Sequence, residues 1–296
     1  MSRTAATRSG QVRIGISGWR YRGWQGSFYP KKLRQKDELS YASRHVDTIE
    51  INGTHYSLQR PEYFARWRDE TPEDFLFAVK GSRFITHLKQ LRDIETPLAN
   101  FFASGVLRLE EKLGPFLWQF SPRFRFDAEK LDGFLALLPR DSAAAAALAE
   151  HHDDRLKGRA WTKTERKRPL RHAIEIRHPS FLDPAFVRLL RLRNIALVFA
   201  DAVDWPYAED ITADFLYLRL HGSEELYASG YDDDALDHWA TRIRRWRQGA
   251  EPNDAELVDT STRPPRRARD VYIYFDNDAK VRAPVDAQSL RERLQQ

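Results

Sequence analysis

Eight short apolar segments recur along the chain, and each is rich in the branched and aromatic residues typical of β-strands. They are residues 12–16, 48–51, 75–79, 115–120, 173–176, 196–199, 215–220 and 271–275. Between most of them the apolar positions follow a helical period, as in the run Leu236, Trp239, Ile243 and Trp246. Strands that alternate with helices predict a parallel sheet, and eight of them predict a TIM-type (β/α)8 barrel in the α/β class.

The same periodicity predicts the helices. They are expected at residues 36–44, 61–70, 97–113, 128–138, 142–150, 184–193, 234–247 and 287–294, with Gly105 weakening the third. The segment between the sixth and seventh strands, residues 201–214, is short and interrupted by Pro206, so helix six is expected to be short or missing. We expect residues 1–11 to be a disordered lead-in and residues 12–296 to form a single barrel domain.

Three of the predicted strands end in two polar residues spaced two apart. These pairs are Glu50 and Asn52, Glu175 and Arg177, and Arg219 and His221. Side chains two apart on a strand share a face, so all six should point into the barrel or its mouth. Working sites of such barrels lie at the carboxyl ends of the strands.

Other polar and aromatic residues follow the strands and should join the same face. We expect substrate contacts from Arg177, Arg219, Lys80, Asn52, Gln119, Asp201, Asn277, Trp19, Tyr56 and His87. Glu175 should pair with Arg177, Arg219 or Lys80, which would leave at least one cation for an anion. His221 is the candidate general acid or base, because histidine titrates near neutrality, with Glu50 second. Glu50 and Glu175 together could form an acid–base pair of the glycosidase kind. The alternative is a buried ion-pair network that closes the top of the barrel.

Composition excludes several classes of protein. The chain has 296 residues, 42% of them hydrophobic, which suffices for a sizeable core. The longest apolar run, residues 143–149, is too short to cross a membrane, and the polar N-terminus lacks a signal sequence. We therefore expect a cytoplasmic protein. The absence of cysteine excludes disulfides and thiolate chemistry.

The net charge of +5 permits attraction to phosphate-rich partners. Two basic segments, residues 157–171 and 264–269, precede predicted strands, so they should lie on the face opposite the site. Basic runs of this kind are usually solvated faces.

The predicted site favours an anion over other ligands. Glu50, Glu175, Asp201 and His221 are ligand types that suit a divalent metal, but Lys80, Arg177 and Arg219 beside them would repel it. Whether a metal binds is left open, and no organic cofactor is expected, because no Walker or dinucleotide fingerprint is present. A Gly-x-Ser-x-Gly elbow is also absent, which argues against serine nucleophiles.

Several motifs resemble those of the YecE-like family, domain of unknown function 72. They are Ile14-Gly-Ile-Ser-Gly-Trp19, Glu50-Ile-Asn52, Phe77-Ala-Val-Lys80, Thr86-His87, Lys112-Leu-Gly-Pro115, Glu175-Ile-Arg-His178, Arg219-Leu-His-Gly222 and Tyr274-Phe275 with Asn277. The resemblance extends from about Arg13 to Leu290 and implies a TIM-type barrel, but it brings no established reaction. Residues 151–171 look like an insertion relative to shorter members.

Three functions remain open from the sequence. The first is an enzyme, such as a hydrolase or lyase with Glu/His acid–base chemistry, that acts on a small or terminal anionic group of a phosphate- or sugar-like molecule. The second is a nucleic-acid-binding or processing protein that uses rim aromatics and the basic surface. The third is non-catalytic sensing of a metabolite. The enzyme hypothesis predicts an open pocket that reaches Arg219 and His221.

Overall fold

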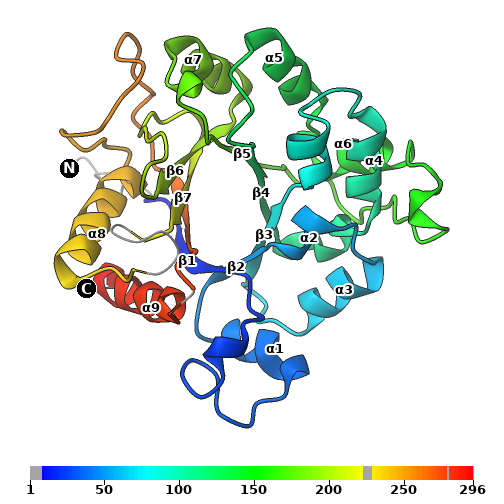
Figure 1. Cartoon of the computed structure of the whole chain (residues 1–296), viewed down its shortest axis with the longest axis horizontal. Helices are drawn as coiled ribbons and strands as arrows, with labels where there is room; N and C mark the ends of the chain where they lie inside the picture. The colour runs from blue at the N-terminus through cyan, green and yellow to red at the C-terminus, as the bar shows by residue number, and fades with distance from the viewer. Residues whose placement is uncertain (1–8, 223–228, 279, 296) are drawn as a thin grey trace, which may run out of the picture.

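Eight parallel strands form a closed barrel in the order in which they occur in the chain (Figure 1). The computed structural model describes residues 9–222, 229–278 and 280–295. The strands are β1 (Val12–Ser17), β2 (Thr48–Ile51), β3 (Leu76–Lys80), β4 (Leu113–Gln119), β5 (His172–Glu175), β6 (Ala196–Asp201), β7 (Phe215–Leu220) and β8 (Asp270–Phe275). Strand β8 pairs with β1 from Val271 opposite Val12 to Phe275 opposite Ile16, which closes the barrel. The predicted TIM-type barrel is confirmed.

Helices surround the barrel on its outside (Figure 1). They are α1 (Glu38–Ala42), α2 (Gly53–Tyr56), α3 (Pro61–Asp69), α4 (Glu95–Ala103), α5 (Ala128–Leu137), α6 (Ser142–Ala149), α7 (Pro184–Arg193), α8 (Asp233–Arg247) and α9 (Arg282–Gln295). Asp127, Asp141, Asp183 and Asp232 cap the N-termini of α5 to α8 by accepting a hydrogen bond from a backbone N–H of the first turn.

One predicted helix is wrong as a continuous element. The segment expected to be helical over residues 97–113 divides at Gly105, whose φ of 113° lies in the left-handed region. A side chain at Gly105 would place its Cβ 2.4 Å from the Cα of Pro61. The chain therefore turns here because α3 approaches closely, and residues Val106–Lys112 continue as 3-10 turns.

Helix six is missing, as predicted. Residues 202–214, all of them described, contain no helix between β6 and β7. Buried polar groups hold this connection in place instead. The Thr212 hydroxyl donates to the carbonyl of Ile195 at 2.7 Å and accepts from the amide of Leu197 at 2.7 Å. The carboxylate of Asp210 accepts from the amide of Val258 at 2.7 Å. The connection thus packs against the segment that precedes β8.

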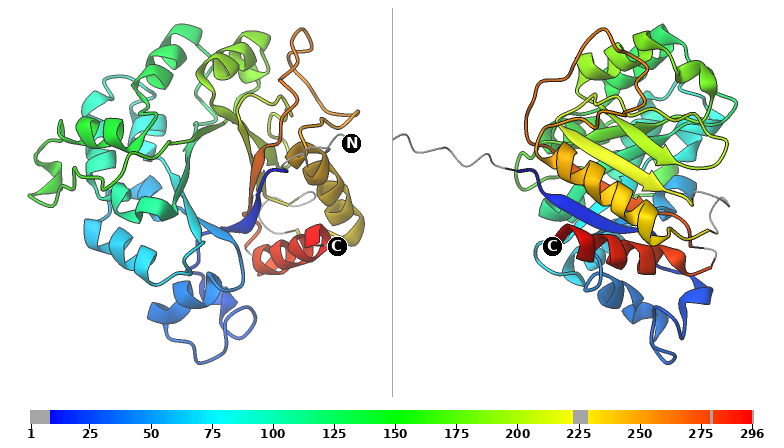
Figure 2. Two further views of the ribbon diagram at one scale, coloured as in Figure 1. Left: turned by 180° about the vertical axis from the view of Figure 1, so that it is seen from behind. Right: turned by 90° about the vertical axis from the view of Figure 1, so that its left-hand side faces the viewer.

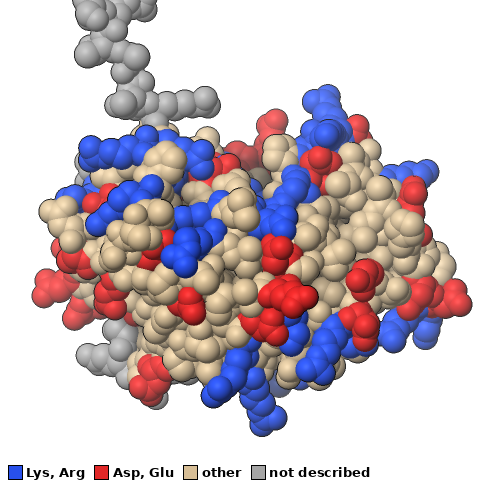
Figure 3. Space-filling model, turned by 90° about the horizontal axis from the view of Figure 1, so that it is seen from above, with Lys and Arg blue, Asp and Glu red and all other residues tan. Residues whose placement is uncertain are grey.

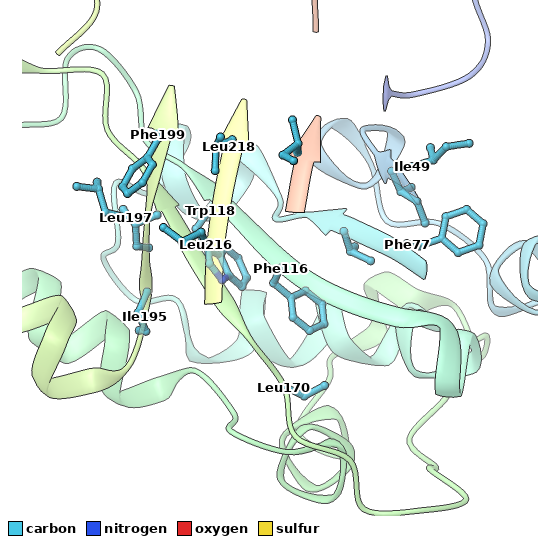
Figure 4. Packing of buried hydrophobic residues seen from close by; sticks show 14 of the residues in the cluster. Ile49, Phe77, Phe116, Trp118, Leu170, Ile195, Leu197, Phe199, Leu216 and Leu218 are labelled. Carbon is cyan, nitrogen blue, oxygen red and sulfur yellow. The ribbon is translucent and has the colours of Figure 1, made fainter. Parts of the chain in front are cut away.

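Alternate residues of each strand belong to two different cores. The outward-facing ones pack beneath the helices, as Figure 4 shows for Leu197 and Phe199 on β6 and for Leu216 and Leu218 on β7. The inward-facing ones fill the barrel and include Ala78, Leu117, Ala173, Val198, Tyr217 and Tyr274. Because several of the inner residues are small, the two tyrosines fit between them, with ring centroids 4.9 Å apart. The next inward-facing positions along the strands carry polar side chains.

The arrowheads of β1 (blue) and β7 (yellow) point to the same side in the right view of Figure 2. The basic segments 157–171 and 264–269 lead into β5 and β8, so they lie at the amino-terminal ends of these strands, as predicted. Residues 1–8 of the predicted disordered lead-in lie outside the described residues. No helix of the described chain is long and apolar enough to cross a bilayer.

Candidate functional site

The uppermost layer of the barrel interior is a cluster of polar side chains, here called the polar cluster. Its members are Ser17, Glu50, Lys80, Gln119, Glu175, Arg177, Tyr217, Arg219, His221 and Asp276. They come from the carboxyl ends of β1, β2, β3, β4, β5, β7 and β8 or from the residues directly after them. The barrel therefore brings together residues that are far apart in the chain.

Arg219 lies at the centre of the polar cluster and is fully buried. Its Nη1 donates to Glu175 Oε2 at 2.7 Å, and its Nη2 donates to Glu50 Oε1 at 2.9 Å. The same Nη2 lies 2.7 Å from Asp276 Oδ2. Burial alone would lower the pKa of Arg219, but the three carboxylates outweigh it and raise that pKa well above its ordinary value. The guanidinium thus links β7 to β2, to β5 and to the segment after β8 at the mouth of the barrel.

The two glutamates have further donors. The carboxylate of Glu50 accepts from the Ser17 hydroxyl at 2.9 Å and from the Tyr217 hydroxyl at 2.6 Å. Glu175 accepts hydrogen bonds from Arg177 Nε at 2.5 Å and from Gln119 Nε2 at 3.1 Å, and it forms an ion pair with Nη2 of Arg177.

Burial favours a raised pKa for Glu175, but Arg177 and Arg219 outweigh it and hold the pKa well below its ordinary value. The predicted pairing of Glu175 with an arginine is confirmed.

His221 is also fully buried, and each of its ring nitrogens lies close to a charged group. Its Nδ1 lies 3.2 Å from Asp276 Oδ2, and its Nε2 lies 3.3 Å from Arg219 Nη1. Burial and the charge of Arg219 lower the pKa of His221 despite the nearby carboxylate. Burial would raise the pKa of Asp276, but Arg219 and His221 hold it below its ordinary value. The imidazole thus lies inside the cluster, between Asp276 and Arg219.

Trp205, in the connection between β6 and β7, covers the polar cluster. The guanidinium carbon of Arg177 lies 3.1 Å from the centroid of the indole ring, which is a cation–π contact. The same ring meets His221 edge-on, at 4.5 Å between centroids and 65° between planes. The five cavities lined by described residues, of about 290 to 490 Å³, include neither Arg219 nor His221. The open pocket predicted to reach them is therefore not found among these cavities.

Lys80 differs from the other charged members of the polar cluster. Its side chain ends β3 and is only 8% exposed, yet its ammonium makes no hydrogen bond or ion pair with any described residue. Burial, reinforced by the charge of Arg219, lowers the pKa of Lys80. Among the described residues, Lys80 is thus a charged member of the polar cluster that the carboxylates do not bind directly, and whether it binds an anion stays a prediction.

Other predicted site residues lie on the rim. Asn52 and Trp19 line a separate cavity of about 290 Å³ that also includes Tyr21 and Trp67. Trp19 packs perpendicular to Trp67, with ring centroids 5.3 Å apart. Tyr56 is 68% exposed and points to solvent.

His87 is bonded to the hydroxyl of its neighbour Thr86 at 2.9 Å, and its ring lies 5.2 Å from that of His55.

Two of the predicted site residues, Asp201 and Asn277, make contacts outside the polar cluster. Asp201 accepts from the Tyr231 hydroxyl at 2.8 Å and faces α8, where it lines a cavity with Trp239. Asn277 donates to Asp286 at 2.8 Å and so ties the segment after β8 to α9. Of the four residues proposed as metal ligands, Glu50, Glu175 and His221 thus lie around Arg219 in the polar cluster, whereas Asp201 faces α8. No group of three His, Asp or Glu side chains within residues 9–222, 229–278 and 280–295 is arranged to hold a metal ion.

Sequence reasoning missed Ser17, Tyr217, Asp276 and Trp205. For three of them a signal was present, because each lies two residues from another inward-facing position on its own strand. Asp276 follows Tyr274, and Tyr217 precedes Arg219, at the spacing that identified the polar pairs. Trp205 lies in an irregular connection, where no periodicity indicates the direction of a side chain.

Comparisons with known proteins agree with this architecture. Residues 13–296 match the family model "Protein of unknown function DUF72". The chain is 24% identical over 266 residues to the UPF0759 protein YecE of Escherichia coli strain K12, covering 81% of this chain and 84% of that protein. It is 33% identical to the UPF0759 protein YunF of Bacillus subtilis strain 168, over 75 residues that cover 25% of this chain and 26% of that one.

Solved structures share the fold. A DUF72 family protein of Thermotoga maritima MSB8 superimposes with a TM-score of 0.74 at 23% identity, covering 97% of this chain and 100% of that one. A DUF72 family protein of Enterococcus faecalis V583 gives a TM-score of 0.66 at 18% identity, covering 97% and 98%. Since the family model spans nearly the whole sequence, the chain belongs to the DUF72 family, as its motifs indicated.

Proposed function

We propose that the protein is an enzyme that acts on a small molecule with an anionic group, bound at the carboxyl ends of the barrel strands. The observation that supports this proposal is the unpartnered ammonium of Lys80 beside carboxylates that are already paired. The carboxylates nearest to Lys80 are bound to Arg219, so an anionic ligand would give its ammonium a direct partner.

Lys112 shows what a buried lysine with a structural role looks like in the same chain. It is 6% exposed, and its Nζ donates to the carbonyls of Arg68 at 2.6 Å and Thr71 at 2.8 Å. It also reaches the Thr71 hydroxyl at 3.2 Å. Lys80 has none of these contacts, so a purely structural role does not explain why it is buried.

The roles first expected for Glu50, Glu175 and His221 change in this proposal. Each of these side chains is fully buried and engaged with Arg219. They are better suited to position Arg219 and Lys80 than to reach a substrate themselves. Lys80 and Arg177, at the solvent side of the cluster, are the groups that meet the ligand in this proposal.

Ligand-induced stabilisation tests the proposal. Inorganic phosphate and lactate should raise the melting temperature of the wild-type protein, because a ligand that binds the folded state stabilises it by mass action. Lys80→Met should abolish the effect. The control is Lys163→Met, which removes the same charge from an exposed position in the segment before β5. Equal responses from both variants would show that the anions bind the surface in general and would refute the proposal.

Nucleic-acid binding, the alternative function, has less support. On the left half of the side shown in Figure 3, Lys and Arg gather toward the upper edge and Asp and Glu toward the lower edge. The basic segments lie at the amino-terminal ends of β5 and β8, whereas the polar cluster lies at the carboxyl ends. Filter binding at low salt with retained RNA or DNA, weakened steeply by added salt, would favour this alternative.

A further inference from the structure

Lys80 has the surroundings of a reactive amine. Its amino group makes no hydrogen bond within the described chain, although its side chain is as buried as that of Lys112. The absence of a bond matters because an amine that donates all its protons to carbonyl groups is fixed in the ammonium form.

The neighbours of Lys80 also favour its neutral amine over its ammonium. The carboxylates of Glu50, Glu175 and Asp276 would stabilise its ammonium, but all three are bound to Arg219. Burial, followed by the positive charge of Arg219, lowers the pKa of Lys80. Burial next to a second cation is one of the ways in which proteins activate a lysine as a nucleophile.

We infer that Lys80 forms an imine with a carbonyl group of the substrate, an inference that rests on the proposed function. The substrate is then a small oxo acid or a phosphorylated ketone or aldehyde. These substrate classes share a carbonyl group that lies close to an anionic group. The nucleophile is the amine of Lys80. The cation that the anionic group meets is Arg177, whose side chain is 7% exposed, whereas Arg219 is fully buried.

The step balances without an added oxidant or reductant. The ammonium of Lys80 first gives one proton to water, and the nitrogen lone pair then forms a bond to the carbonyl carbon. The carbonyl oxygen takes up two protons, the one given to water and a second that the nitrogen loses after the attack, and it leaves as water when the carbon–oxygen bond breaks. Overall, one ammonium and one carbonyl group give one iminium ion and one water molecule.

The formation of the iminium ion leaves the net charge of the polar cluster unchanged. An iminium ion carries the same single positive charge as the ammonium it replaces, so the balance with the three carboxylates is unchanged. The anionic group of the substrate arrives together with the carbonyl group and meets Arg177, beside the iminium ion that replaces the ammonium of Lys80. Imine formation therefore needs no rearrangement of the contacts of Arg219.

Reductive trapping tests the inference. The full-length protein is incubated with pyruvate or with dihydroxyacetone phosphate, and sodium borohydride is added to convert an imine to a stable secondary amine. Peptide mass spectrometry then locates the adduct. We expect it on Lys80 and not on Lys112, which serves as a buried lysine within the same molecule. Lactate and glycerol phosphate, which carry the anion without the carbonyl group, should reduce the yield by competition.

Two variants distinguish the possible results. Lys80→Met should lose the adduct, and Lys80→Arg should lose it while keeping the cation, with the melting temperature of each showing that it has folded. An adduct formed with pyruvate alone or with the phosphate ester alone identifies which of the two substrate classes is used. Adducts spread over surface lysines and unchanged in Lys80→Met would overturn the inference.

The experiments distinguish a failure of imine formation from a failure of the proposed function, which is anion binding. If no adduct forms, but lactate or phosphate stabilises the wild type and not Lys80→Met, the imine is refuted and anion binding stands. If neither anion stabilises the wild type and no adduct forms, both are refuted.

Discussion

Lys80 and Lys112 are buried to similar extents, but only Lys112 has hydrogen-bond partners among the described residues. We therefore expect opposite effects from the same substitution. Lys80→Met should raise the free energy of unfolding by roughly 1–3 kcal/mol, because it removes a buried unpaired charge. Lys112→Met should lower it by about 1–3 kcal/mol, since it leaves buried carbonyl groups without a donor. Urea denaturation at pH 7 measures both. If Lys80→Met destabilises the protein as much as Lys112→Met, Lys80 has a structural role instead.

Glu175 should contribute strongly to stability, because it is the common partner of Arg177 and Arg219. Glu175→Gln keeps the size of the side chain but removes the charge that neutralises two buried guanidinium groups. We expect a loss of about 3–5 kcal/mol in the free energy of unfolding. Asp37→Asn is the control, since it breaks the exposed ion pair with Arg34, 2.7 Å long, and should cost under about 1 kcal/mol. Equal losses in the two variants would contradict the central role of Glu175.

Alternation along the strands was enough to predict most of the polar cluster. Glu50, Glu175 and Arg219 were identified because polar residues at that spacing have no place on a strand buried on both faces. The fully buried state of His221 was not predicted, because it depends on Trp205. Nothing local in the sequence shows that this indole folds back over the strands, since its direction is set by contacts with residues distant in the chain.

At the scale of elements, alanine substitutions at two glycines test why residues 97–113 do not form one continuous helix. Gly105 lies at the break, and Gly133 lies inside a regular helix. Gly105→Ala should destabilise the protein, because its φ is 113° and the new Cβ would lie 2.4 Å from Pro61 Cα. Gly133 lies within α5, where an added Cβ meets no atom within 4 Å. Gly133→Ala should therefore stabilise the protein by about 0.5–1 kcal/mol, through the higher helix propensity of alanine.

Thermal denaturation of both variants measures this contrast. The interpretation of the break at Gly105 is wrong if both alanines stabilise the protein.

The strands could be predicted closely because each one is a compact apolar run with clear ends. The division of the predicted helix 97–113 could not, because it results from the approach of α3, a tertiary contact that no local pattern encodes. Helix six could be predicted to be missing because Pro206 and the length of the connection are local properties. Prediction thus succeeded where the cause lies within the segment and failed where it lies in another element.

At the scale of the whole molecule, the barrel separates two kinds of surface. The carboxyl ends of the strands carry the polar cluster, and the basic segments lead into the amino ends of β5 and β8. A substitution in one region should therefore leave the other unaffected, since effects of distant sites are additive. This separation is what makes Lys163→Met a suitable control for Lys80→Met.

The polar cluster should also make stability depend on pH in a defined way. The pKa of Asp276 lies below its ordinary value, since Arg219, His221 and Lys80 outweigh the effect of burial. Tyr21 and Asp278 also face it, and burial together with the charge of Asp276 raises the pKa of Asp278 to about 6. An aspartate in the unfolded chain has a pKa of about 3.9, so on acidification the unfolded state takes up this proton before the folded state does. The stabilisation by Asp276 is thus fully present above about pH 5 and is lost as the pH falls further.

Because other buried carboxyl groups have raised pKa values, the pH profile of the wild type alone would mix opposing effects. A comparison with Asp276→Asn isolates the group of interest. Between about pH 7 and pH 5 the difference in free energy of unfolding between the two proteins should rise slightly, because protonation of Asp278 relieves a repulsion by Asp276 that the variant lacks. Below about pH 5 it should shrink steadily toward pH 2. Urea denaturation at each pH measures it, with Asp37→Asn as an exposed reference. A difference that keeps growing below about pH 5 would mean that Asp276 is protonated in the folded protein, and the network around Arg219 would then lack one of its three anions.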